Sequence, residues 1–151
     1  MRSLRVRASL LLSASLLAGT PRSTRAEPAP VRGDGGLDVT ASCEHRATKG
    51  RVLCDVELEV PSGRIAWADV VVLSVPPFAA PLRSRASGAD ARTRTDRRMR
   101  IPVAFVATAL GRGAVSVRGR AVVCTAGERG ESCSPRSGTT TAELLVGTDV
   151  Q

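Results

Sequence analysis

The residues best suited to chemistry in this sequence are its four cysteines, Cys43, Cys54, Cys124 and Cys133. Four cysteines can form two disulfides in three ways, and the order of residues along the chain does not select among them. We favour the local pairing, which joins the first two cysteines and the last two. Each of these pairs spans a short predicted hairpin, where opposed strand positions meet the Cα spacing of about 5.5 Å that a disulfide needs. In this prediction the bridge between Cys43 and Cys54 is purely structural.

A rival pairing joins Cys54 to Cys124 across two sheets. Trp67 lies 13 residues after Cys54, and Cys124 lies 70 residues after Cys54. This order of Cys, Trp and Cys is similar to that of immunoglobulin domains, in which a bridge between the sheets packs on a buried tryptophan. Those domains also carry a tyrosine two residues before the second cysteine. Val122 stands at that place in this sequence.

The segment over residues 115–146 resembles a second group of proteins. In the immunoglobulin-like N-terminal periplasmic domain of bacterial thiol:disulfide interchange proteins, a strand leads into a cysteine, a short loop, a second cysteine closely followed by proline, and a final strand. Cys124, Cys133 and Pro135 occupy these places. The resemblance extends over roughly residues 50–147. It implies that Cys124 and Cys133 form a redox pair that accepts reductant and passes it to exported partners.

Exchange chemistry requires an exposed cysteine that can form a thiolate. Arg129 and Arg136 would favour a thiolate at this pair, whereas Glu128 and Glu131 would oppose it. The alternative is a bridge that holds the last hairpin together, which is the usual role of disulfides in exported domains. The leading hypothesis is therefore a binding or structural module that is not an enzyme. A thiol-disulfide oxidoreductase using Cys124 and Cys133 is the alternative.

Patterns for other chemistry are weak or missing in the sequence. His45 is the only histidine, and its spacing from Cys43 and Cys54 does not match the usual zinc motifs. We therefore predict no metal site and no cofactor, and we expect His45 to be solvated in a hairpin loop. The sequence contains no G-x-S-x-G elbow, phosphate-binding loop or H-E-x-x-H helix, which disfavours classical hydrolase chemistry.

The first residues have the three-part form of a secretory signal peptide. Arg2, Arg5 and Arg7 precede an apolar run of 11 residues at positions 8–18, and small residues precede a cleavage site near Ala26. The run is much shorter than the ~20 residues that a membrane-spanning helix needs. We expect export to the periplasm or the extracellular space, with no transmembrane segment in the mature chain. The alternative is an amphipathic or an uncleaved N-terminal helix.

After this signal peptide, over residues 1–26, we expect a flexible linker over residues 27–36 and one domain over residues 37–151. Apolar and polar residues alternate along the domain, as in half-buried antiparallel strands. The predicted strands cover residues 37–43, 52–60, 65–75, 99–107, 115–123 and 142–146. They indicate an all-β, immunoglobulin-like antiparallel β-sandwich of six to seven strands, with a long arginine-rich loop between residues 79 and 98. Pro102 should place its strand at an edge or make its start irregular.

Six apolar residues are our predictions for the centre of the core. They are Val56, Leu58, Trp67, Val72, Phe105 and Val117.

The formal charge of +8 is concentrated in two segments. Residues 1–26 carry five arginines and no acid, and residues 83–100 carry seven arginines and two aspartates. Without the leader the charge is 17 − 14, or +3. We expect the second segment to meet an exported protein or an anionic surface. Nucleic acid is not expected, because the segment has no aromatic residue to stack on a base. The residues predicted for this contact are Arg92, Arg94, Arg97, Arg98 and Arg100.

Overall fold

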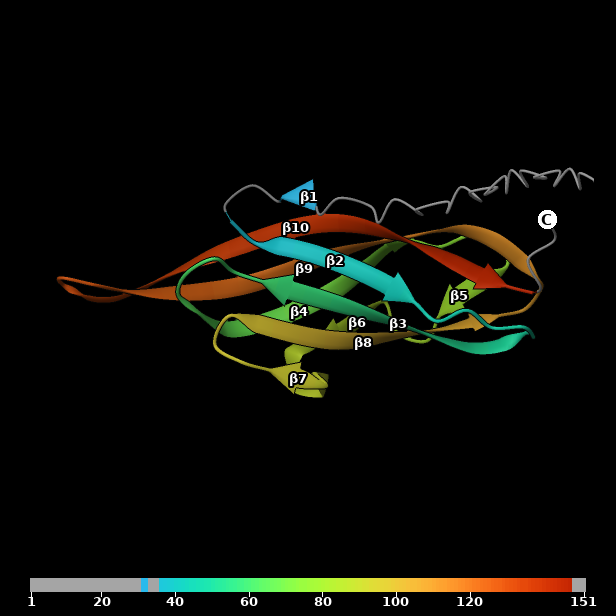
Figure 1. Cartoon of the computed structure of the whole chain (residues 1–151), viewed down its shortest axis with the longest axis horizontal. Coiled ribbons are helices and arrows are strands. Elements are labelled where there is room, and N and C mark those ends of the chain that lie inside the picture. The colour runs from blue at the N-terminus through green and yellow to red at the C-terminus, as the bar shows by residue number, and fades with distance from the viewer. Residues whose placement is uncertain (1–30, 33–35, 148–151) are drawn as a thin grey trace, which may run out of the picture.

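A computed structural model describes residues 31–32 and 36–147 of the chain. The predicted signal peptide and most of the predicted linker lie outside the described residues. Among those residues, no helix is long and apolar enough to cross a membrane. Two antiparallel sheets pack face to face (Figure 1).

Sheet A has six strands and sheet B has four. The order in sheet A is β1 (Val31–Arg32), β2 (Asp38–Cys43), β3 (Gly50–Glu59), β8 (Arg98–Ala107) and β5 (Ala79–Pro81), with β7 (Thr93–Arg94) also paired to β8. The order in sheet B is β10 (Gly130–Val146), β9 (Gly111–Gly127), β4 (Arg64–Ser74) and β6 (Arg85–Ser87). One 3-10 turn, η1 (Gly88–Asp90), follows β6.

This strand order confirms the predicted immunoglobulin-like β-sandwich. In sequence order, β2, β3, β7 and β8 take the places of strands A, B, D and E, which form one sheet of an immunoglobulin domain. The strands β4, β6, β9 and β10 take the places of C, C′, F and G in the other sheet. The six predicted strands correspond to β2, β3, β4, β8, β9 and β10.

The number of strands exceeds the six to seven predicted, and the reason lies in the segment expected to be one long loop. It contains β5, β6, β7 and η1. Two of these strands have three residues and one has two. Strands this short carry too few residues to show a period of two, so the sequence pattern does not reveal them. They also carry the chain from sheet A at β5 to sheet B at β6 and back at β7.

The core lies between the sheets and consists of residues that alternate along the long strands. Its largest fully buried side chains are Phe105, Leu37, Leu58, Met99, Ile101 and Leu144. The predicted core residues Val56, Leu58, Phe105 and Val117 are all buried. Val72 is partly buried against this cluster.

The prediction for Trp67 is wrong, since 43% of this residue is exposed. The register between β4 and β9 shifts between Ile65 and Trp67, where Ile65 pairs with Val123 and Trp67 pairs with Val122. Ala66 is therefore an extra residue on β4, and a bulge of one residue reverses the faces of the side chains that follow it. Ile65 points into the core, whereas Trp67 points to the outer face of sheet B.

Pro102 lies in a paired strand and not at the free edge of a sheet. On one side β8 pairs with β3 along its whole length. On the other side β7 pairs with residues 99–100, β5 pairs with residues 105–107, and no described strand lies opposite Pro102. Proline lacks a backbone N–H, so it is tolerated at this interruption of the ladder.

Gly119, in the middle of β9, packs closely against the side chains of sheet A. A Cβ added there would lie 2.9 Å from Leu58 Cδ2 and 3.0 Å from Val39 Cγ2. We expect Gly119→Val to lower the free energy of unfolding by about 1–3 kcal/mol, because an overpacked core must shift its side chains. Chemical denaturation of the oxidised protein measures this change.

Gly127→Val is the matched control on the same strand. A Cβ added at Gly127 would meet only Gly130 O, at 3.5 Å. Equal destabilisation by the two substitutions would contradict the proposed close packing at Gly119.

Candidate functional site

The Cys124–Cys133 disulfide lies where the β9–β10 hairpin leaves the sandwich. The two cysteines are directly opposite each other, with a Cα–Cα distance of 4.0 Å. Pairing of β4 with β9 begins at Cys124, so residues 125–132 continue as a two-stranded ribbon. Figure 1 shows this ribbon extending past the other strands. Cys133 is exposed, whereas only 3% of Cys124 is exposed.

The second predicted bridge, Cys43–Cys54, is also present, with a Cα–Cα distance of 3.9 Å. Both local pairings are thus confirmed. The rival bridge from Cys54 to Cys124 is excluded by the alternation of the strands. Cys54 belongs to the buried inner face of β3, and Cys124 follows the inward-facing Val123 and therefore lies on the outer face of β9.

A carboxylate and a guanidinium lie beside the outer disulfide. A carboxylate oxygen of Glu131 and the two sulfur atoms of the bridge lie within 4.8 Å of one another. Glu131 Oε1 accepts a hydrogen bond from Arg64 Nη2 at 2.8 Å. While the two sulfurs are joined in a disulfide they supply no thiolate for a metal ion. The local charges are thus one anion and one cation next to the disulfide.

The sequence did not point to Arg64 as a neighbour of these cysteines, because Arg64 lies on β4 and meets Cys124 only through sheet pairing. Glu128 and Arg129 lie at the tip of the ribbon, three residue pairs beyond the bridge. Arg136 lies opposite Ala121, whose side chain points inward. Of the four charged residues expected near the pair, only Glu131 is placed at the sulfur atoms.

The arginines predicted to contact a partner lie on the side of sheet A, and three of them form ion pairs with β3. Arg92 Nη1 lies 3.3 Å from Asp55, Arg98 Nη2 lies 2.9 Å from Glu59, and Arg100 Nη2 lies 2.9 Å from Glu57. These pairs are half exposed, so each contributes little to stability. The acids of β3 also neutralise the positive charge of three of the five arginines that were predicted to contact a partner.

Arg94 and Arg97 are the remaining two arginines of that prediction. Both are exposed. Neither takes part in an ion pair with a residue that the structure describes. The segment therefore presents less unpaired positive charge than its composition indicates.

The outer face of sheet B carries an ionic cluster around a buried carboxylate, which the sequence pattern did not reveal. Asp69 is only 1% exposed, although it lies on the outer face of β4, which no layer within residues 36–147 covers. Its carboxylate accepts two hydrogen bonds from Arg120, from Nε at 2.8 Å and from Nη2 at 2.5 Å. Arg85 Nε also contacts Oδ2 of Asp69. The two arginines thus cover the carboxylate and hold it in a fixed position.

Trp67 completes this cluster. The guanidinium carbon of Arg85 lies 5.7 Å from the centroid of the Trp67 ring, which is within the range of a cation–π contact. On its other side Trp67 pairs with Val122 of β9, and Val122 pairs with Pro135 of β10. We call this set of five residues, Trp67, Arg85, Arg120, Val122 and Pro135, the Trp67 surface.

Burial alone would raise the pKa of Asp69. The hydrogen bonds and charges of Arg120 and Arg85 outweigh this effect and hold the pKa below its ordinary value. The carboxylate therefore remains ionised, and the cluster of Arg120, Asp69 and Arg85 keeps a net charge of +1 at neutral pH. A positive and rigid surface results beside an exposed indole ring.

One sequence signal could have indicated the cluster. Asp69 is the only charged residue between Ile65 and Val75, a segment that otherwise reads as a core strand. A lone acid in such a segment implies a basic partner, because an unpaired buried carboxylate is costly. The identity of the partners depends on pairing with β6 and β9, which the sequence does not reveal.

His45 is exposed, as expected, but it also forms a contact with the end of β10. Its Nε2 lies 2.6 Å from Gly147 O. Backbone bonds between Arg46 and residues 145 and 147 attach the same loop to β10. This arrangement supports a structural role for His45.

The fold and this surface together define the class of the molecule, a disulfide-stabilised immunoglobulin-like β-sandwich module. No known family model, no curated protein and no solved structure matches the chain.

We expect Asp69→Asn to lower the free energy of unfolding by about 1–3 kcal/mol at pH 7, because the two arginines lose their anionic partner. In the wild type the lowered pKa means that the unfolded chain takes up a proton near pH 3.9 before the folded chain does. The stabilisation is therefore complete above that pH and is lost as the pH falls through the folded pKa. Denaturation between pH 7 and pH 2 should show the two proteins converging.

Asp38→Asn on sheet A is the control, with an expected change below about 0.5 kcal/mol. A difference between wild type and Asp69→Asn that does not depend on pH would contradict the ionic role of Asp69.

Proposed function

We propose that this protein is an exported binding module that recognises another exported protein through the Trp67 surface. The observation that carries the proposal is the exposure of 43% of Trp67, the only tryptophan of the chain, on a face that none of the described strands covers. Tryptophan and arginine are the residues most enriched among interface positions that dominate binding energy. A structural role alone would favour a buried tryptophan.

The Trp67 surface is held in place before any partner arrives. Trp67 contacts Arg85, Arg85 contacts Asp69, and Asp69 holds Arg120 through two hydrogen bonds. Side chains fixed in this way lose little conformational entropy on binding, which favours affinity. Arg85 belongs to the arginine-rich segment over residues 83–100, so part of that segment contributes to the proposed contact.

The charge of the surface favours an acidic partner over a second copy of this chain. The outward side chains of sheet B include Arg64, Arg85, Arg112, Arg118 and Arg120, against Asp69, Glu131 and Glu143. The net charge of these side chains is +2. If sheet B of one copy packed on sheet B of another, like charges would therefore lie together. A partner surface with acidic residues around an apolar centre would complement the Trp67 surface.

Export is part of the proposal and is supported by two kinds of observation. The sequence begins with a signal-like segment, and all four cysteines form disulfides. Disulfides persist in oxidising compartments and are rare in the cytosol.

Site-specific photo-crosslinking tests the binding role. A photoreactive residue at Ser137, on the outer face beside Arg120, should give an adduct in the exported fraction of the producing cells. The same residue at Thr40, on the outer face of sheet A, should not. Trp67→Ala should weaken binding to the captured and purified partner by at least about 30-fold, which corresponds to the 2 kcal/mol of a dominant interface residue.

Leu110→Ala is the matched control, since Leu110 is another exposed apolar residue, at 61%, outside the Trp67 surface. It should leave the affinity unchanged. An adduct at Ser137 that survives Trp67→Ala, or no adduct at this position, would reject the proposed surface.

A second function is favoured by the position of Cys133. This exposed residue lies one row of residues away from Trp67, Val122 and Pro135, so a partner bound there would be next to the disulfide. In an exchange, a partner thiolate attacks the Cys133 sulfur and releases Cys124 as a thiolate. A second partner thiol resolves the mixed disulfide, which leaves the partner oxidised and both cysteines reduced by two electrons and two protons.

A redox titration separates this activity from a structural bridge. The full protein is equilibrated in glutathione buffers, alkylated and mapped by mass spectrometry, so that each disulfide is followed on its own. Exchange predicts a Cys124–Cys133 potential at or above about −230 mV, with Cys43–Cys54 remaining as the internal control below about −300 mV. A potential below about −300 mV for both bridges would exclude the exchange function and leave the binding function intact.

A further inference from the structure

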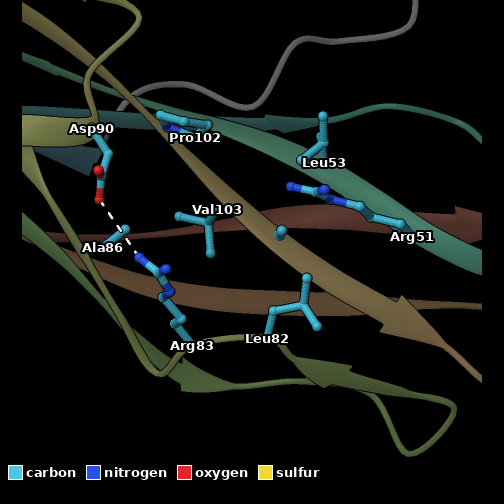
Figure 2. A pocket seen from close by; sticks show the side chains of 9 residues that line it. Arg51, Leu53, Leu82, Arg83, Ala86, Asp90, Pro102 and Val103 are labelled. Atoms are coloured by element: carbon cyan, nitrogen blue, oxygen red, sulfur yellow. Dashed lines mark ion pairs between the residues drawn. The ribbon is translucent and has the colours of Figure 1, made fainter.

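A concave site lies between β8 and the segment that crosses from β5 to β6. It is a cavity of about 290 Å³. Its apolar part comes from Leu53, Leu82, Ala86, Pro102, Val103 and Ala104. Figure 2 shows Arg51 entering this site from β3 and Arg83 entering from the crossing segment, with Val103 between them. The volume suits a group the size of one or two residues.

The cavity lies at the interruption of the β8 ladder. Arg92 N donates to Arg100 O at 2.8 Å, and Leu82 N donates to Ala104 O at 2.9 Å. Alternate residues of a strand direct their backbone groups to the same edge, so the carbonyl of Pro102 points to this edge between the two bonds. No described strand lies opposite Pro102 there. An amide N–H of a ligand can use this acceptor in the way that a further strand would.

The charges around the cavity favour an anion. No ion pair with a described residue involves Arg51. Among the described residues, the ionic partner of Arg83 is distant, with 4.0 Å between Arg83 Nη1 and Asp90 Oδ2. Arg51, Arg83 and Asp90 together carry a net charge of +1, which the charge of one carboxylate balances. A guanidinium binds a carboxylate through two parallel hydrogen bonds, so arginine is well suited to this role.

We propose that this cavity binds the C-terminal residue of a peptide, or a free N-acyl amino acid, with an apolar side chain. Arg51 and Arg83 hold the carboxylate, the side chain packs on Leu53 and Leu82, and the amide N–H donates to the carbonyl of Pro102. The site is independent of the Trp67 surface, because none of its lining residues belongs to that surface.

Titration of the isotope-labelled, disulfide-intact protein followed by NMR tests the proposal. N-acetyl-L-leucine should bind saturably and shift the backbone amides of Leu82, Ala86 and Ala104. N-acetyl-L-leucinamide, which lacks the carboxylate, and N-acetylglycine, which lacks the side chain, should each bind at least tenfold more weakly. 4-Methylpentanoate keeps the carboxylate and the apolar group but lacks the amide, and it should also bind more weakly.

Substitutions provide the matched test on the protein. Arg51→Gln should weaken N-acetyl-L-leucine binding at least tenfold, because the carboxylate loses its guanidinium partner. Arg94→Gln removes the same charge from an exposed arginine that does not line the cavity, so it should leave binding unchanged. Trp67→Ala should also leave it unchanged, which keeps this test separate from that of the binding function.

A peptide that ends in Ala-Leu distinguishes the two sources of the ligand. Tighter binding of this peptide identifies a protein C-terminus, and equal binding identifies a free N-acyl amino acid, and both support the site. Equal affinity of the acid and its amide, or equal effects of Arg51→Gln and Arg94→Gln, would overturn it.

Discussion

The side chains of β4 change faces at Ala66, because the bulge between Ile65 and Trp67 inserts one residue that has no partner on β9. A strict period of two would place Trp67 in the core beside Ile65. The shift instead places Trp67 and Asp69 on the outer face of sheet B. There Arg120 and Arg85 enclose the carboxylate of Asp69 and stabilise its charge. The shape and the charge of the proposed binding surface both depend on this one extra residue.

The same alternation separates the two disulfides. Cys54 lies on an inner face and joins Cys43, its neighbour on β2, whereas Cys124 lies on an outer face and joins Cys133. The first bridge belongs to the core, and the second connects the strands where the ribbon leaves the sheet. The molecule thus has an immunoglobulin-like strand order without a bridge between its sheets. Each bridge instead joins neighbouring strands of one sheet.

In the folded chain the arginines of the arginine-rich segment lie in three different environments. Arg92, Arg98 and Arg100 pair with the carboxylates of β3, and Arg85 crosses to sheet B and joins the Trp67 surface. Arg83 enters the cavity at the broken edge of β8. Net charge along the sequence therefore overstates how much of this segment is available to one partner, because charges from distant strands meet it in the sheets.

The sequence by itself determined the all-β class and the six long strands, and it favoured the two local disulfides that the structure contains. These features depend on a period of two and on hairpin neighbours, which are local properties of the chain. Only the tertiary structure decided that Trp67 is exposed, that Asp69 meets Arg85 and Arg120, and that a cavity opens at Pro102. These depend on a bulge and on the register of strands far apart in sequence, and no local pattern encodes that register.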